Sequence, residues 1–229
     1  IEFIKTNIIG AQNIIEEAMD AGVEKIVALS TDKASSPINL YGATKLCSDK
    51  LFTSANNIKG SNKIKFSVVR YGNVFGSRGS IAPIFAKVKK NQNYLVTDNS
   101  MTRFNITLKQ SVEMVTWAIK NMHGGEIFVP KIPSYNIIDL VKAFNSRPKI
   151  KKIGIRPGEK LHEEMISISE AINTVDLGKY YAILNEFAKN TRKYKKSIFV
   201  DKNFHYNSGK NPEFLSTNSL KKIIKSELK

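Results

Sequence analysis

The pattern of apolar and polar positions in the first part of the chain predicts helices and strands that follow one another in turn. Apolar residues recur every three or four positions up to Gly22, which ends an amphipathic helix. Two short, nearly continuous apolar runs are typical of strands that are covered on both faces of a parallel sheet. The predicted helices lie at 1–21, 40–56 and 81–92, and the predicted strands at 25–30 and 65–72. This order predicts a partial doubly wound parallel sheet of the α/β class, with right-handed crossovers.

Beyond residue 90 the pattern changes to short strands mixed with short helices. The predicted strands lie at 94–98, 103–108, 126–130 and 151–156, and the predicted helices at 108–122 and 136–144. A further strand at 179–184 and a capped helix at 216–228 are expected in the Lys- and Asn-rich tail. We therefore predict two domains, with the first over residues 1–90 and a smaller α/β substrate lobe and tail over 91–229.

Composition and charge favour a globular protein and argue against a membrane-spanning, secreted or nucleic-acid-binding one. The 229 residues are 41% hydrophobic and 24% charged, as in globular proteins. No apolar run approaches the roughly 20 residues of a membrane span, no signal peptide is visible, and the single Cys47 fits a reducing cytoplasm. The net charge of +16 would suit nucleic acid, but the lysines are spread along the whole chain with little aromatic interleaving. We expect no nucleic-acid partner, and the charge also suits an anionic small substrate.

The segment STDKASSPINLYGATK at 30–45 gathers titratable side chains directly after the first predicted strand. Tyr41 and Lys45 are four residues apart, so they share one face of a helix. A nearby ammonium favours the phenolate, which makes a tyrosine usable as a base near neutral pH. The carboxyl ends of parallel strands are where open α/β sheets bind ligands. We therefore expect Thr31, Asp32 and Lys33 to converge with this pair on one cleft.

A cradle for cofactor phosphates is missing from the chain. A glycine-rich turn should follow the first strand of a Rossmann-type dinucleotide-binding domain and open its first helix. The cluster of Gly72, Gly76 and Gly79 follows a different strand and opens no helix of that kind. We therefore expect that the first half of the domain, with both phosphate loops, is absent, and that Ile1 begins at the helix before the central strand.

The position of Thr31, Tyr41 and Lys45 after a buried strand resembles the extended short-chain dehydrogenase/reductase family, whose members act on nucleotide-sugars. The resemblance implies that Thr31 supplies the hydroxyl beside Ser30, that Tyr41 is the base, and that Lys45 holds the nicotinamide ribose. It also implies tightly held NADP and a homo-hexamer. The segment RYGNVFGSRGS at 70–80 resembles the family's next loop, although a simple Gly-rich turn is the alternative. In that loop Asn73 would meet the substrate, and the nicotinamide would be bordered by Val74, Phe75, Gly76 and Ser77.

Asp32 and Lys33 bear on which reaction the resemblance implies. Within this family the C4 epimerases need only Thr, Tyr and Lys, whereas the common hexose 4,6-dehydratases add an Asp-Glu pair after the threonine. Once C4 is a ketone, a neutral amine can remove the acidic C5 proton, and a protonated Asp32 can give its proton to the departing C6 hydroxyl. A lysine in the position of Lys33 is a feature of the UDP-N-acetylglucosamine 4,6-dehydratases. The alternative is that Asp32 and Lys33 form a solvated ion pair in a surface turn without a catalytic role.

Further segments are similar to the inverting members of that group, which begin pseudaminic acid synthesis. These segments are MTRF at 101–104, MHGGEIFVPKIPS at 122–134 and IRPGEKLHEEMI at 155–166. The resemblance implies that Arg103, Arg156 and Glu159 contact the nucleotide, since arginine binds phosphate bidentately. Tyr41 favours the inverting branch, because a related branch often has Met there.

The sequence is compatible with several functions. The leading interpretation is a cytoplasmic lyase that converts UDP-N-acetylglucosamine to a 4-keto-6-deoxy sugar with C5 inversion, although this chain alone is expected to be inactive. The alternatives are a C5-retaining dehydratase, a C4 epimerase, and a non-catalytic relic or basic interaction module. His123 and His162 lie far apart in sequence without Cys or carboxylate partners at ligand spacing, so we predict no metal site.

Overall fold

The computed structural model describes residues 1–89 and 91–228, which form two compact units. The first unit comprises Ile1–Tyr71, Val112–Lys131 and Glu164–Tyr206, and the second comprises Gly72–Ser111, Ile132–Glu163 and Asn207–Lys229. The chain passes between the units several times, so their boundaries do not coincide with the predicted division at residue 90.

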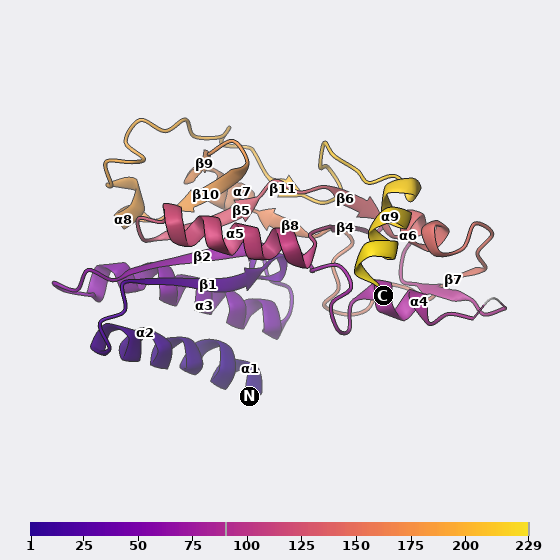
Figure 1. Ribbon diagram of the computed structural model, residues 1–229, viewed down its shortest axis with the longest axis horizontal. Helices are drawn as coiled ribbons and strands as arrows, with labels where there is room; N and C mark the ends of the chain where they lie inside the picture. The colour runs from indigo at the N-terminus through magenta and orange to yellow at the C-terminus, as the bar shows by residue number, and fades with distance from the viewer. Residues whose placement is uncertain (90, 229) are drawn as a thin grey trace. The chain divides into compact units, whose positions relative to one another are not determined.

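A five-stranded sheet forms the centre of the first unit (Figure 1). Its strands, in spatial order, are β1 (Lys25–Thr31), β2 (Lys65–Tyr71), β5 (Glu126–Pro130), β10 (Tyr180–Leu184) and β9 (Thr174–Asp176). The first three run parallel, and β10 is antiparallel to both of its neighbours. The predicted α/β fold is confirmed, with a sheet that is mixed.

The placement of β5 corrects the predicted smaller lobe. Residues 126–130 were expected there, yet Val69 pairs with Phe128 in parallel register and places β5 beside β2. The whole of β5 is buried. A continuous apolar run satisfies its backbone groups best in the interior of a sheet, where both of its faces are covered.

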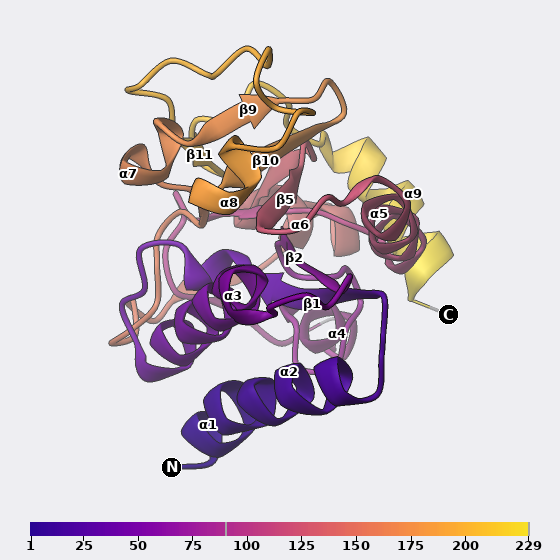
Figure 2. The ribbon, with the colours of Figure 1, turned by 90° about the vertical axis from the view of Figure 1, so that its left-hand side faces the viewer.

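Helices cover both faces of this sheet, as Figure 2 shows with α3 (Leu40–Ile58) on one face and α5 (Leu108–Asn121) on the other. On α5, Met114 and Ala118 lie four residues apart and pack with Val69 and Phe128 in one core. The other helices of this unit are α1 (Glu2–Ile4), α2 (Gly10–Asp20), α7 (Ile168–Ala171) and α8 (Glu186–Lys189). A π-helical turn at Lys5–Ile9 joins α1 to α2, so the predicted helix over 1–21 is confirmed with one irregular turn.

The second unit is built from short elements around its own core. Its helices are α4 (Ile81–Ala86), α6 (Ile137–Phe144) and α9 (Thr217–Glu227), and its strands are β3 (Tyr94–Val96), β4 (Thr102–Phe104), β6 (Ser134–Asn136) and β7 (Ile150–Lys152). Strand β8 (Glu164–Ile166) belongs to the first unit, and β11 (Tyr206–Asn207) lies at the boundary. Phe85, Tyr94, Leu140 and Leu220 are buried together in this core.

Of two predicted helices that lie in this unit, one is confirmed and the other is shorter than predicted. Helix α9 begins after Ser216, whose hydroxyl accepts from the Ser219 N–H, as the predicted cap requires. The helix predicted over 81–92 ends at Ala86, and residue 90 within that range lies outside the described residues. None of the described helices is long and apolar enough to cross a membrane.

Candidate active site

The chain turns sharply after β1 and places three functional groups in direct contact. The Thr31 hydroxyl donates to Asp32 Oδ1 at 3.0 Å and accepts from the Lys33 N–H at 3.4 Å, which caps the single 3₁₀ turn Asp32–Ala34. Lys33 Nζ lies 3.1 Å from the same carboxylate oxygen. Asp32 is only 1% exposed, whereas the Lys33 side chain remains 29% exposed. A hydroxyl, a carboxyl group and an amine therefore form one hydrogen-bonded set, directly after the buried Ser30.

Helix α3 begins a few residues later and carries Tyr41 and Lys45. Asn39 caps the helix, since its Oδ1 accepts from the Gly42 N–H at 2.8 Å. The Tyr41 ring packs edge-on against Phe3, with 5.5 Å between ring centroids. Lys45 Nζ donates to the Leu29 carbonyl oxygen at 2.8 Å, which ties α3 to the carboxyl-terminal part of β1. Burial lowers the pKa of the Lys45 ammonium, and the nearby Asp49 carboxylate opposes that shift.

Lys45 also borders a groove beside β1, the terminal strand of the sheet among the described residues. The groove encloses about 250 Å³ between α2, β1 and α3, and Ile14 and Leu29 contribute apolar side chains to it. Leu29 and Ile14 are 52% and 54% exposed, although Leu29 belongs to a strand of the central sheet. This edge of the first unit therefore combines an apolar surface with one ammonium group.

Gly42 brings the Asp32–Ala34 turn close to α3. A Cβ atom at this position would collide with the Lys33 carbonyl oxygen and lie 3.0 Å from the Pro37 Cβ. Both atoms belong to the segment that leads from β1 into α3. Glycine is therefore required for the close approach that places Lys33 against the first turn of the helix, beside Tyr41.

We expect Gly42→Ala to lower the melting temperature by about 3–10 °C, because forcing a methyl group against backbone costs about 1–3 kcal/mol. The measurement is thermal unfolding followed by circular dichroism. Gly10→Ala is the matched control, because its Cβ would meet the nearest atom, Lys5 O, at an ordinary 3.5 Å. This control should melt at or above the wild-type temperature, since alanine favours helix. Equal melting of Gly42→Ala and wild type would contradict the close approach.

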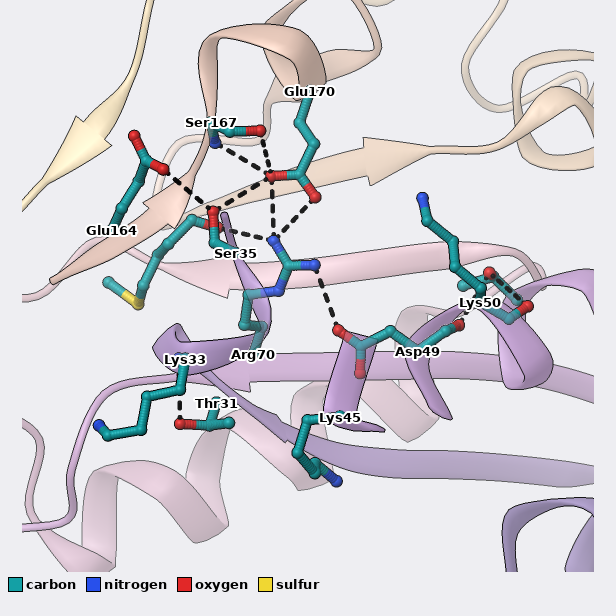
Figure 3. A network of polar contacts seen from close by, with 12 residues as sticks. Thr31, Lys33, Ser35, Lys45, Asp49, Lys50, Arg70, Glu164, Ser167 and Glu170 are labelled. Atoms are coloured by element: carbon teal, nitrogen blue, oxygen red, sulfur yellow. Dashed lines mark hydrogen bonds and ion pairs between the residues drawn. The ribbon is translucent and has the colours of Figure 1, made fainter. Parts of the chain in front are cut away.

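A buried arginine that was not singled out from the sequence, Arg70, lies between Asp49 and Glu170 (Figure 3). Arg70 on β2 is 0% exposed. Its Nη2 is 3.2 Å from Asp49 Oδ2 on α3, and its Nη1 is 2.9 Å from Glu170 Oε1 on α7. Burial raises the pKa of the Asp49 carboxyl, and the Arg70 guanidinium opposes that shift. Its burial could have been predicted from the sequence, because Arg70 lies inside an apolar strand and a buried arginine requires polar partners.

In the second unit the predicted nucleotide-binding residues gather around one segment. Arg103 is buried and donates to the Leu161 carbonyl oxygen at 3.2 Å. Its guanidinium lies 3.6 Å from carboxylate oxygens of both Glu159 and Glu163. The Arg156 N–H donates to Glu159 Oε2 at 3.4 Å. The structure therefore brings Arg103, Glu159 and the backbone of Arg156 together within this unit.

The loop after β2 also belongs to the second unit. Val74 forms a bridge with Ile106, and the buried Phe75 donates its N–H to the Ile106 carbonyl oxygen at 2.8 Å. Gly76 has a φ of +76°, and a Cβ atom on this residue would lie only 3.1 Å from Leu228 Cδ2. Asn73 and Ser77 are exposed. That this loop and Arg103 share a cleft with Thr31 and Lys45 stays a prediction.

Comparisons with known proteins identify the family. Residues 1–185 match the model of the family described as polysaccharide biosynthesis protein. The chain belongs to that family. It is a homologue of UDP-N-acetylglucosamine 4,6-dehydratase (inverting) from Campylobacter jejuni, with 48% identity over 98% of this chain and 70% of that protein. UDP-glucose 4-epimerase from Rickettsia bellii is 44% identical over 80% of this chain and 55% of its own length.

The curated relatives are nucleotide-sugar dehydratases and epimerases, and solved structures share the fold of this chain. The X-ray structure of Pen from Bacillus thuringiensis matches with a TM-score of 0.87 and 37% identity, over 98% of this chain and 69% of that one. UDP-glucose 4-epimerase from Thermus thermophilus, solved in complex with NAD, matches with a TM-score of 0.56 and 21% identity over 68% of this chain and 60% of its own. The latter similarity shows the shared fold.

Proposed function

We propose that the chain carries the catalytic residues of an inverting UDP-N-acetylglucosamine 4,6-dehydratase. The observation that carries the proposal is the contact of 3.1 Å between Lys33 Nζ and the buried Asp32 carboxylate, directly after Thr31. Gly42 packs the helix that bears Tyr41 and Lys45 against the same turn. The similarity to the Campylobacter jejuni dehydratase extends over 98% of this chain and supports the same assignment.

Asp32 and Lys33 can supply the acid and the base of the elimination together. Transfer of one proton from the Lys33 ammonium to the Asp32 carboxylate, across the contact of 3.1 Å, yields a neutral amine and a carboxylic acid. A substrate that covers the pair and excludes water favours this neutral form. The amine then takes the C5 proton, and the acid protonates the C6 oxygen. A C5–C6 double bond forms as water leaves.

Tyr41 and Lys45 fit the nicotinamide end of an NADP molecule. The Lys45 ammonium borders the groove beside β1 and would donate to the ribose hydroxyls, while Tyr41 accepts the proton from O4 of the sugar. Bound NADP would supply the hydride acceptor at C4 and the hydride donor at C6. No glycine-rich phosphate loop follows β1. The phosphate loops of such a site would come from polypeptide other than this chain, and the complete enzyme means this chain together with that polypeptide.

The second unit is proposed to bind the nucleotide. Arg103 would contact the diphosphate, with Arg156 and Glu159 on the uridine side and Asn73 toward the sugar. The guanidinium of Arg103 already faces two carboxylates, Glu159 and Glu163, which hold it in one orientation. An arginine held in this way loses little conformational entropy when it binds phosphate.

The complete enzyme is expected to convert UDP-N-acetylglucosamine in deuterated water to a 4-keto-6-deoxy product with one deuterium at C5 and inverted C5 configuration. Lys33 gives up the abstracted proton to solvent before C5 is reprotonated on the opposite face. NMR reads the deuterium from the loss of the C5 proton signal and of its splitting of the C6 methyl signal, and the C5 configuration from the proton couplings of the product formed in ordinary water. A parallel reaction in ordinary water is the control.

Each other outcome of this experiment points to a different member of the family. Deuterium at C5 with the original configuration would assign the protein to the retaining dehydratases. A C4 epimer without C5 deuterium would assign it to the epimerases. An unchanged substrate would favour the non-catalytic alternative.

A further inference from the structure

The buried Arg70 connects two elements near the proposed catalytic residues. One is α3, which carries Tyr41 and Lys45, and the other is α7, which contacts the segment after the Asp32–Ala34 turn. Through Asp49, Arg70 contacts α3, one turn beyond Lys45 and two turns beyond Tyr41. Through Glu170 it contacts α7, and its Nη1 also donates to the carbonyl oxygen of Met165 on β8 at 2.9 Å. A single fully buried guanidinium therefore fixes the position of α3 relative to the segment that contains β8 and α7.

That segment in turn holds the residues that follow the Asp32–Ala34 turn. Figure 3 shows the contacts of Ser35 with Glu164 and Glu170. The Ser35 hydroxyl lies 3.5 Å from both Glu164 Oε2 and Glu170 Oε2. The Ser36 hydroxyl donates to Glu164 Oε2 at 2.7 Å. Glu170 Oε2 also accepts from the N–H and the hydroxyl of Ser167. The Glu170 carboxylate is thus shared between Arg70, Ser35 and Ser167.

Ser36 has an unusual backbone conformation at this point. Its φ of 41° makes it the one non-glycine residue with positive φ within residues 1–89 and 91–228. The left-handed region is costly for residues with a Cβ atom, and it persists where surrounding contacts hold the residue in place. The bond from the Ser36 hydroxyl to Glu164 is such a contact.

We propose that Arg70, Glu164 and Glu170 act as positioning residues that hold the Asp32–Lys33 turn at a fixed distance from Tyr41 and Lys45. Arg70 orients Glu170, the two glutamates hold Ser35 and Ser36, and Asp49 anchors the helix. None of the three is placed to touch the sugar in the proposed mechanism. The catalytic consequence rests on the proposed function, whereas the ordering of the turn does not.

The test uses Ser36→Ala and Glu164→Gln, which spare Arg70 and the proposed catalytic residues. Hydrogen–deuterium exchange is measured by mass spectrometry on the chain as it stands, for peptides that cover residues 32–36. In the wild type the Ser35 N–H donates to the Asp32 carbonyl oxygen at 3.3 Å, which slows its exchange. Both variants should exchange about tenfold faster in this segment, with peptides of the second unit unchanged. Ser61→Ala, at an exposed serine, is the matched control and should leave exchange unchanged.

A third variant separates the hydroxyl from the backbone conformation. Ser36→Gly removes the hydroxyl but adopts a positive φ without strain. It should also exchange faster if the bond to Glu164 orders the turn. Exchange at the wild-type rate in Ser36→Gly or in Glu164→Gln would overturn the proposal.

The catalytic consequence is read from steady-state kinetics of the complete enzyme. Ser36→Ala and Glu164→Gln should lower kcat about tenfold and leave KM within about twofold, because the turn acts after the nucleotide has bound. An increase in KM at constant kcat would overturn the positioning role and indicate substrate binding instead. If the wild type forms no product while the exchange differences persist, the proposed function fails and the ordering of the turn stands.

Discussion

Lys33→Ala is expected to lower turnover of UDP-N-acetylglucosamine by the complete enzyme about 10²–10⁴-fold, the range that a positioned general base contributes. The amine acts on C5 only after the nucleotide-sugar has bound and C4 has been oxidised. The dissociation constant for the substrate should therefore change little. Turnover is measured by product formation, and binding by titration calorimetry on the same preparation.

The same substitution on a lysine outside the site provides the control. Lys50 lies on α3 with an exposed side chain, and Lys50→Ala should keep both turnover and binding. Lys33→Ala also removes the ion-pair partner of the buried Asp32, so its unfolding is followed in parallel to confirm that the protein is folded at the assay temperature. Wild-type turnover in Lys33→Ala would show that the ion pair of Asp32 and Lys33 has no catalytic role.

Arg70→Met is expected to lower the free energy of unfolding by about 3–5 kcal/mol, as found when one partner of a buried ion pair is removed. The methionine fills much of the space but leaves the Asp49 and Glu170 carboxylates without a cation. Urea unfolding at pH 7, followed by tryptophan fluorescence and circular dichroism, measures the loss. Arg78→Met, at an exposed arginine, should change the value by less than about 0.5 kcal/mol.

The loss should also depend on pH in a defined direction. Burial raises the pKa of Asp49 and Arg70 opposes this rise, so removing Arg70 raises the pKa further. A carboxyl group whose folded-state pKa is raised stabilises the protein below its unfolded pKa, and that contribution is lost as pH rises through the folded value. The deficit of Arg70→Met should therefore shrink as the pH is lowered from 7 toward 4. A deficit independent of pH would contradict the role of the buried carboxylates, and adding Asp49→Asn should recover part of the stability at pH 7.

The strands and helices near the proposed site could be predicted from the sequence because their signals are local. The apolar run at 25–30 became β1, and the periodic stretch at 40–56 became α3. The contact between Asp32 and Lys33 also follows from adjacent residues in a capped turn. Helix α4 ends at Ala86, before its predicted end, although Val88 beyond it still packs against the core of the second unit.

By itself the sequence determined the elements next to the proposed site, the α/β class and the succession Thr31, Asp32, Lys33, Tyr41 and Lys45, since helical and strand periodicity and side-chain chemistry are properties of neighbouring residues. The tertiary structure alone decided that β5 joins β2 and that β10 lies antiparallel between β5 and β9, because strand pairing depends on which hydrogen-bonding edge is left open. It also decided the partners of Arg70, since Asp49 and Glu170 are distant from it in the chain. A buried guanidinium requires carboxylates, but only the packing of α3 and α7 on the sheet determines which ones reach it.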